Sequence, residues 1–184
     1  AASDVYKRQI KTYPDPILRR PTKRADPGSP ETQGAIVALR EAFDPETALG
    51  LAANQIGHPV RVAIVRLGEE TKVLLNPEVV ERSEELEVES EGCLSLPGVE
   101  AEVPRPKRVV VRAQDEEGKE LRLEAEGLEA RLLLHEIDHL DGILYIDHLS
   151  AAERREVLRK YREVRRSSAP ASSSPGQGRS RSPL

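Results

Sequence analysis

Apolar residues recur at three- and four-residue spacing in three segments of the chain, which predicts three helices. The segments are residues 30–43, 127–142 and 151–166. The second segment is apolar on two neighbouring faces, as expected of a central, buried helix. Its first face carries Leu128, Leu132, His135 and His139, and its second carries Leu133, Ile137 and Leu140. The third helix has only a narrow apolar stripe, and Ser150 with Glu153 forms a capping-box pattern at its start.

Shorter segments rich in β-branched and aliphatic residues predict five strands. They span residues 61–66, 72–75, 86–90, 107–113 and 120–125. The Asp-Glu-Glu-Gly sequence between the last two strands has the composition of a hairpin turn. Together these elements predict an α+β fold, in which antiparallel or mixed sheets pack around the second helix.

The two ends of the chain differ in composition from the middle. Residues 1–9 lack periodicity and a signal-peptide core, so we interpret them as a remnant of cloning or sequence assembly, or as a disordered native segment. Residues 167–184 hold seven serines, three prolines and two glycines, which predicts a disordered tail. We therefore expect one functional domain at residues 10–149, followed by a basic helix at residues 150–166.

Composition limits the classes of function. Lys and Arg total 28 and Asp and Glu total 32, and a net charge of −4 argues against general nucleic-acid binding. Residues 151–184 nevertheless hold nine basic and three acidic residues, so the last helix is either a solvated face or a docking element for an anionic partner. The single cysteine, Cys93, excludes an intrachain disulfide and indicates a reducing compartment such as the cytoplasm.

A His-Glu-x-x-His pattern occupies residues 135–139, inside the predicted central helix. His135 and His139 are one turn apart and project side by side, so they can hold one metal ion. Glu136, next to the first histidine, can reach a water molecule at that ion. The alternative, a pair of ordinary core histidines, leaves the glutamate between them unexplained.

A catalytic metal site also needs a third protein ligand and an open position. Tyr145 stands where one class of metalloproteases has its third histidine, and His148 lies three residues beyond that position. Upstream, Cys93 lies in a glycine-containing loop, and its thiolate would complete a Cys-His-His set. The alternative for a lone cysteine is an inert, buried side chain.

Residues 49–57 form a third candidate segment. Their small side chains let other groups approach the backbone closely, and Gln55 offers an amide donor in an otherwise apolar run. Spacing alone does not distinguish a functional Gln55 from an exposed one in a tight loop.

Together these segments resemble the motifs of the peptide deformylase family. The chain reads Ala48-Leu-Gly-Leu-Ala-Ala-Asn-Gln55, then Glu91-Gly-Cys-Leu-Ser95, then Leu134-His-Glu-Ile-Asp-His-Leu-Asp-Gly142, in the order found in that family. Residues 13–19 also match the family's N-terminal stretch, and the likeness runs from Ile10 to Arg166. Two residues depart from the family pattern, because Ala48 replaces a glycine and Leu134 replaces a glutamine.

The resemblance implies an enzyme that removes the formyl group from N-formylmethionine at the start of new polypeptides and releases formate. It implies one divalent ion held by Cys93, His135 and His139, with Fe(II) as the native metal. A thiolate with two imidazoles also suits Ni, Co or Zn, so the sequence does not select the ion.

The resemblance also implies roles for residues around the ion. Glu136 would take a proton from the attacking water and deliver it to the leaving amine. The N–H of Leu94 and the amide of Gln55 would stabilise the oxyanion. Asp138, on the buried helix, needs a partner, and Arg105 is the candidate.

The methionine side chain of the substrate needs a pocket. We expect its wall to come from the helix turns before His135, with Leu128, Arg131 and Leu132, and from the strand around Glu89. Glu89 and Arg131 are expected to pair along this wall. Gly50 would let the substrate backbone approach closely.

Two rival interpretations stay open at the level of sequence. One is a zinc endopeptidase that uses the same His-Glu-x-x-His pattern with a third ligand from elsewhere. The other is a ribosome- or RNA-binding protein with a structural metal, supported by the basic region at residues 151–184. A structural site normally has four protein ligands, and His148 is the only further candidate nearby. In a deformylase, the helix at residues 150–166 would face ribosomal RNA close to the substrate.

Overall fold

The computed structural model describes residues 10–168 and 183–184. One sheet contains β1 (Gly50–Ala52), β2 (Val62–Leu67), β3 (Glu70–Arg82), β6 (Arg108–Gln114) and β7 (Glu120–Glu126). A second sheet contains β4 (Leu86–Cys93) and β5 (Leu96–Pro106). The helices are α2 (Pro30–Ala42), α3 (Gly127–Leu140) and α4 (Ala151–Ser167), with short 3-10 helices η1 (Pro16–Arg19), η2 (Ala53–Ile56) and η3 (Tyr145–His148).

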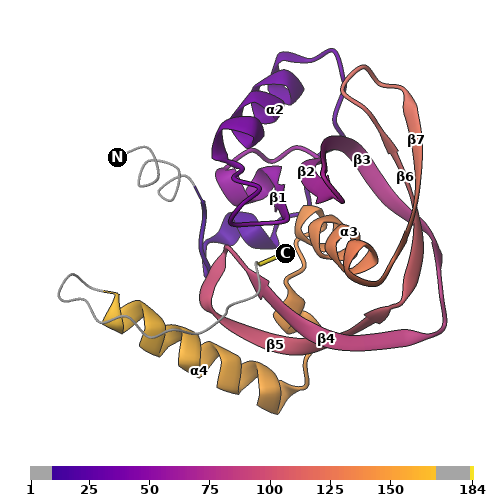
Figure 1. The fold of residues 1–184 in the computed structure, drawn as a ribbon. Helices are drawn as coiled ribbons and strands as arrows, with labels where there is room; N and C mark the ends of the chain where they lie inside the picture. The colour runs from indigo at the N-terminus through magenta and orange to yellow at the C-terminus, as the bar shows by residue number, and fades with distance from the viewer. Residues whose placement is uncertain (1–9, 169–182) are drawn as a thin grey trace.

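The larger sheet has the strand order β1-β2-β3-β6-β7, and every neighbouring pair is antiparallel. Helix α3 packs against this sheet and also contacts β5 of the smaller sheet, so it lies between the two (Figure 1). Helix α2 covers β2, and α4 lies along β5 on the outside of the smaller sheet. The predicted α+β arrangement around a central helix is confirmed. No helix within the described residues is both long and apolar enough to cross a membrane.

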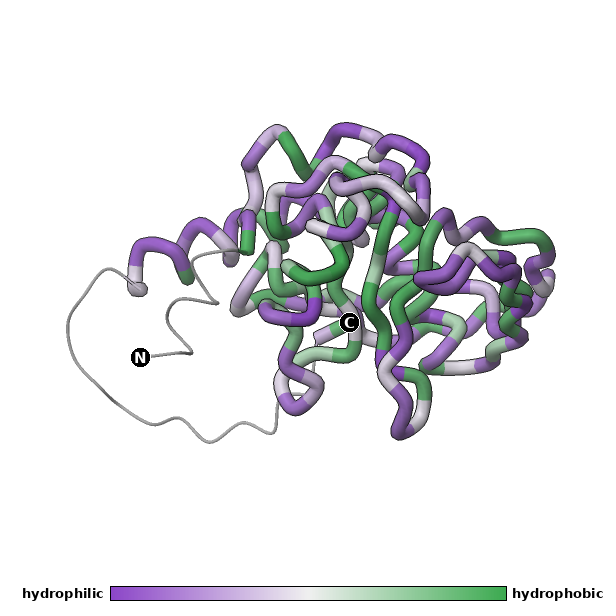
Figure 2. Tube along the Cα trace, turned by 90° about the horizontal axis from the view of Figure 1, so that it is seen from above, coloured by the Kyte–Doolittle hydropathy of each residue, from purple (hydrophilic) through white to green (hydrophobic). Residues whose placement is uncertain are grey.

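Two apolar clusters form on opposite faces of the larger sheet. Neighbouring residues of one strand point to opposite faces, so Ile64 packs toward α2 while Val65 packs toward α3. In β3, Leu75 likewise belongs to the cluster on the α2 side and Leu74 to the cluster on the α3 side. Figure 2 shows the hydrophobic stretches running through the interior, whereas α4 is largely hydrophilic. The side of α3 that faces the sheet is therefore fixed by burial, which leaves its other side for the site.

The three predicted helices are confirmed to within two residues at each end. The capping box at the start of α4 is present, with the N–H of Glu153 donating to Oγ of Ser150 at 3.2 Å. The predicted turn between β6 and β7 also forms, and the N–H of Asp115 donates to the carbonyl of Lys119 at 2.9 Å. The apolar stripe of α4 packs on β5, with Val157 and Tyr161 buried.

The sequence interpretation was incomplete for the strands. β3 continues past Asn76 to Arg82, and its pairing with β6 shifts register between Leu75 and Glu78. The side chain of Asn76 bonds both the N–H and the carbonyl of Ala25. β5 was missed, since three prolines argue against a strand. They are tolerated because β5 pairs on one side only, with β4. β1 was also missed, because three residues are too few to show alternation.

The prediction that Leu128 lies on a buried face of the central helix is wrong. Its side chain is 60% exposed, whereas Leu132 and Leu133 are buried. The physical reason is position, because Leu128 lies in the first turn of α3, at the edge of the cover that the sheets provide. The alternating strand β4 likewise presents Leu86 and Val88 to solvent.

The predictions for the ends of the chain fall mostly outside the described residues. The interpretation of residues 1–9 lies wholly outside them. Of the predicted disordered tail at residues 167–184, Ser167 is the last residue of α4. Pro183 and Leu184 are the other described residues of this range, and Leu184 is 4% exposed.

Candidate active site

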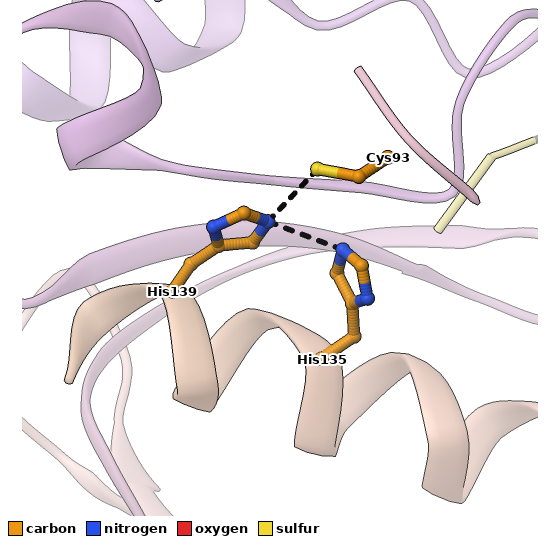
Figure 3. Close-up of side chains that lie close together, drawn as sticks. All are labelled: Cys93, His135 and His139. Atoms are coloured by element: carbon orange, nitrogen blue, oxygen red, sulfur yellow. Dashed lines mark hydrogen bonds between the residues drawn. The ribbon is translucent and has the colours of Figure 1, made fainter. Parts of the chain in front are cut away.

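Three potential metal ligands meet on the side of α3 that faces away from the larger sheet. The Nε2 atoms of His135 and His139 lie 3.1 Å apart. The Sγ atom of Cys93, at the end of β4, lies 3.1 Å from Nε2 of His139 (Figure 3). The ligand atoms of all three side chains lie within 4.8 Å of one another, and all three side chains are buried. No other group of this kind is found in the part of the chain that the structure describes.

The turn between β4 and β5 directs the thiol toward α3. The pairing register shifts between Gly92 and Cys93, so that Cys93 faces Leu96 across a tight turn. The N–H of Ser95 donates to Sγ at 3.3 Å, and Nε2 of Gln55 lies 3.6 Å from the same sulfur. These donors hold the thiol in the orientation that meets the imidazoles.

The carboxylate of Glu136 is buried beside the cluster. Neither of its oxygens has a hydrogen-bond partner among the described residues. Burial raises the pKa of this carboxyl group to about 7, while the nearby His135 acts to lower it. A buried carboxyl group without a partner is costly, so Glu136 is suited to exchange a proton with a small molecule at the cluster.

The cluster and Glu136 together fit one divalent metal ion. A thiolate with two imidazoles is a donor set that binds Fe, Co, Ni or Zn. Three protein ligands leave one position open, which is the arrangement of catalytic rather than structural sites. The unpaired oxygens of Glu136 lie beside that arrangement and are free to bond a water molecule.

The environments of the two histidines differ. For His135, burial lowers the pKa, but contacts with Cys93 and Glu91 raise it and prevail. For His139, burial lowers the pKa and the neighbouring His135 lowers it further. The backbone carbonyl of His139 accepts a hydrogen bond from Nδ2 of Asn54 at 2.6 Å, which ties this turn of α3 to η2. His139 is held as a neutral imidazole, the form that binds a metal.

A buried ionic network surrounds Glu91. Its Oε2 lies 3.0 Å from Nδ1 of His135, and its Oε1 accepts from Nε of Arg105 at 2.7 Å and from Nη1 of Arg131 at 2.9 Å. Burial raises the pKa of Glu91, but the bonds from His135 and Arg105 lower it more, so its net pKa lies well below the ordinary value. The carboxylate therefore stays charged and fixes the ring of His135, as partners of metal ligands commonly do.

The expected ion pair between Arg105 and Asp138 is present, with Nη1 and Oδ2 2.6 Å apart. The same oxygen of Asp138 lies 2.8 Å from Nε2 of His148. Burial raises the pKa of Asp138, but His148 and Arg105 lower it more, and its net pKa is lowered. His148 is thus engaged by Asp138 and is not part of the Cys93 cluster.

Gln55 is buried in η2 at 1% exposure, which decides against an exposed loop residue. Its Oε1 accepts from the N–H of Ala52 at 2.9 Å, and its Nε2 donates to Oγ of Ser95 at 3.0 Å. The amide nitrogen therefore faces the thiol of Cys93. Leu94, the next residue, lines the cleft beside it.

A cleft of about 1250 Å³ opens beside the cluster, between the β4–β5 sheet and the first turns of α3. Of the residues expected to contact the substrate, Glu89, Leu128 and Arg131 line it. Leu132 instead lies in the core behind the cleft, in the apolar cluster of the larger sheet. Nη1 of Arg131 donates to Oε1 of Glu91 at 2.9 Å, and the same nitrogen lies 3.5 Å from the backbone carbonyl of Glu89.

Gly50 and the two departures from the family pattern are buried. A Cβ at Gly50 would lie 2.9 Å from Cδ1 of Leu132 and 3.0 Å from Cδ of Glu136, so a side chain at this position would displace one of these two residues. Ala48 is 1% exposed and Leu134 is 2% exposed. Leu134 lies within the apolar cluster, which accommodates leucine without an unsatisfied amide.

Sequence reasoning did not assign a role to Glu91 or Ser95. A signal for Glu91 was available, because residues two apart on a strand share a face. Glu91 and Cys93 end the same strand, so both point toward α3. For Ser95 no such signal existed, because its contact with Gln55 joins segments 40 residues apart.

Comparisons with known proteins find similar sequences and similar folds. The family model described as polypeptide deformylase matches residues 7–155. A peptide deformylase of Mesorhizobium japonicum is 43% identical over 165 residues, covering 85% of this chain and 92% of that protein. One of Caldicellulosiruptor bescii is 46% identical over 140 residues, covering 76% and 84%. The crystal structure of a peptide deformylase from Legionella pneumophila superimposes with a TM-score of 0.81 at 34% identity, covering 89% of this chain and 98% of that one.

Given these matches over most of its length, the chain belongs to the polypeptide deformylase family and is an enzyme that removes the formyl group from the N-terminus of newly made polypeptides.

Proposed function

We propose that Cys93, His135 and His139 hold the single divalent ion of this deformylase, and that Fe(II) is its native metal, with Ni, Co or Zn as substitutes. The observation that carries the proposal is the meeting of three buried ligand atoms within 4.8 Å beside an unpaired carboxylate. When bound, the ion would supply Lewis-acid chemistry, which makes water a better nucleophile and the formyl carbon a better electrophile.

Glu136 is the acid–base group of the proposed reaction. An oxygen of its carboxylate takes a proton from the attacking water, and the new C–O bond makes the formyl carbon tetrahedral. The same carboxyl group then gives the proton to the amide nitrogen as the C–N bond breaks. The products are formate and a free N-terminal amine. The burial that raises the pKa of Glu136 to about 7 suits a group that must both accept and return a proton near neutral pH.

The N–H of Leu94 and Nε2 of Gln55 are the proposed donors to the tetrahedral oxyanion. Gln55 suits this role because Ala52 and Ser95 hold its amide in place before substrate arrives. Preorganised donors stabilise developing charge without the cost of reorganisation.

The methionine of the substrate is proposed to occupy the cleft between α3 and β4. Leu128 and the alkyl part of Arg131 supply apolar surface there, and Glu89 lies on the opposite wall. Leu132 supports this wall from the core, and Gly50 keeps Glu136 close to the reacting atoms.

The two rival functions have less support. A zinc endopeptidase of the His-Glu-x-x-His class would take its third ligand from outside the Cys93 loop, whereas the thiol of Cys93 lies 3.1 Å from His139. A structural metal would need a fourth protein ligand, and His148 is bonded to Asp138 instead.

The substrates, nascent formyl-methionine polypeptides, emerge from ribosomes, and we propose that α4 docks on ribosomal RNA to bring the cleft near them. Arg155, Arg162 and Arg166 support this, because all three are exposed and none forms an ion pair with another described residue. We further propose a cytoplasmic location in bacterial-type cells, or the equivalent compartment of an organelle, in keeping with a single reduced thiol.

A paired assay tests the proposed roles. The parent enzyme and the Glu136→Gln variant are loaded with Fe(II) or Ni(II) under low oxygen, and deformylation of a formyl-Met tripeptide is followed beside bound metal. We expect equal metal content, with turnover lost in the variant by about two to four orders of magnitude. Near-parental turnover in Glu136→Gln would rule out the acid–base assignment.

A further inference from the structure

Residues 183–184 form part of the wall of the cleft that the substrate is proposed to use. Pro183 and Leu184 line it together with Cys93, Leu128 and Arg131. The other residues that line the cleft all lie at Arg131 or earlier in the sequence. Pro183 and Leu184 are therefore far in sequence from the rest of the wall. In Figure 1 the end of the chain lies against the body of the domain, near α3, and not beside α4.

Backbone and side chain of this dipeptide are both held. The N–H of Leu49, next to β1, donates to the carbonyl of Pro183 at 3.1 Å. The side chain of Leu184 is 4% exposed and belongs to the apolar cluster that also contains Leu132 and Leu49. An extended peptide bonded to a strand edge, with one side chain in a pocket, is a common mode of peptide recognition.

The chemistry of the dipeptide resembles that of the proposed substrate. Leucine and methionine are unbranched at Cβ and close in volume, so one replaces the other in apolar sites at little cost. The pocket that takes Leu184 is therefore suited to a methionine side chain. A substrate cannot accept from the Leu49 N–H while the Pro183 carbonyl does so, and it cannot use the apolar site while the Leu184 side chain packs there.

We propose that Pro183 and Leu184 act as a built-in competitor, which must leave the cleft before a formyl-methionine polypeptide can bind. This inference rests on the proposed position of the substrate in the cleft. It adds that the enzyme is in equilibrium between a closed form and an open form, and that substrate binds only the open form.

The attachment point of the competitor favours this contact. Helix α4 ends next to the cleft. Gly98 belongs to the cleft wall, and its backbone is so close to α4 that a Cβ built on it would lie 2.6 Å from Cγ1 of Val164. Residues 169–182 separate this end of α4 from Pro183.

The test compares full-length parent with Leu184→Asp, Leu184→Met and Val37→Asp, all loaded with the same metal. An aspartate at position 184 disfavours the apolar cluster, whereas methionine preserves it. Val37 is 56% exposed on α2, away from the cleft, so Val37→Asp introduces the same charge as a control. None of these residues belongs to the catalytic machinery.

If the closed form is populated at about 80–90%, KM for a formyl-Met tripeptide falls about five- to tenfold in Leu184→Asp while kcat is unchanged. Leu184→Met and Val37→Asp keep the parental KM. Amide hydrogen exchange supplies a readout that needs no activity: the Leu49 N–H exchanges faster in Leu184→Asp than in the parent and the two other variants. An unchanged KM together with unchanged exchange at Leu49 would overturn the proposal. If the parent has no deformylase activity but the Leu49 N–H still exchanges faster in Leu184→Asp, the contact of Leu184 is supported. Only the proposed function is then contradicted.

Discussion

The carboxylate of Glu91 lies 3.0 Å from Nδ1 of His135, and this contact joins the proposed metal ligands to a buried network of arginines. Arg105 and Arg131 both donate to the same Glu91, and Arg105 continues to Asp138. One carboxylate thereby orients a histidine of α3 and connects it to β4 and β5. The geometry of the site thus depends on ion pairs that lie beyond the ligands themselves.

Replacing Glu91 tests this dependence. Glu91→Gln removes the charge that fixes His135. It also takes the Glu91 charge away from the buried Arg131 and Arg105, of which Arg105 keeps its ion pair with Asp138. We expect metal affinity to fall about 10- to 100-fold and the free energy of unfolding to fall by about 3–5 kcal/mol. Metal titration and denaturant unfolding measure the two effects separately.

Glu116→Gln is the matched control for Glu91. Glu116 pairs with Arg40 at the surface, where an ion pair contributes at most about 1 kcal/mol. The Glu116→Gln variant should bind the metal with the parental affinity. A Glu91→Gln enzyme that binds metal as tightly as Glu116→Gln would show that His135 needs no partner.

Gln55→Leu tests the oxyanion donor. The substitution keeps the volume of the side chain roughly constant and removes Nε2, so kcat should fall by about two orders of magnitude. KM should change much less, because the oxyanion exists only in the transition state. Steady-state kinetics on a formyl-Met tripeptide separates the two parameters. An effect confined to KM would assign Gln55 to substrate binding instead.

Gly50→Ala tests the close approach of β1 to Glu136. The new methyl group would lie 3.0 Å or less from Glu136 and Leu132, so the carboxyl group must shift. We expect kcat/KM to fall about 10- to 100-fold. Gly34→Ala is the control, since nothing lies within 4 Å of a Cβ there. It lies in the exposed part of α2, so it should raise the free energy of unfolding by about 0.5–1 kcal/mol with parental activity.

Cys93→Ser tests the thiolate as a metal ligand. A hydroxyl at position 93 keeps the size of the side chain but is a poor ligand at neutral pH, so bound metal and turnover should both be lost. Elemental analysis of the purified protein measures the metal directly. Stoichiometric metal in Cys93→Ser would mean that the ligand set is different.

Charge reversal on α4 tests ribosome docking. Changing Arg155, Arg162 and Arg166 to Glu should abolish co-sedimentation with ribosomes and leave hydrolysis of a free formyl-Met tripeptide unchanged. Arg159 is omitted because it pairs with Glu156 and Glu163 on the same helix.

The control for α4 reverses Arg24, Arg82 and Arg122, which are exposed elsewhere on the domain. It makes the same change in net charge and should co-sediment like the parent. Parental binding should weaken steeply between low and physiological salt, because phosphate contacts release counterions. Binding that survives the α4 reversal would locate the docking surface elsewhere.

The amino-acid sequence by itself determined the helices and the principal chemical groups. The 3.6-residue period of α3 both buries one side of the helix and aligns His135 with His139, so a single pattern encodes position and chemistry. The cap of α4 is likewise local, because Ser150 bonds a residue three positions away. Local patterns of this kind are readable because their partners lie within one or two turns.

Tertiary structure alone decided which distant groups meet those histidines. Glu91 reaches His135 across 44 residues, Gln55 reaches Ser95 across 40, and Leu184 joins the cluster of Leu132 only because the chain returns to the cleft. β5 was not predicted from the sequence, because prolines are acceptable in a strand only where it has one neighbour, and the number of neighbours is a property of the tertiary structure. Such contacts follow from packing and from the demand that buried charges find partners, and neither leaves a periodic trace in the sequence.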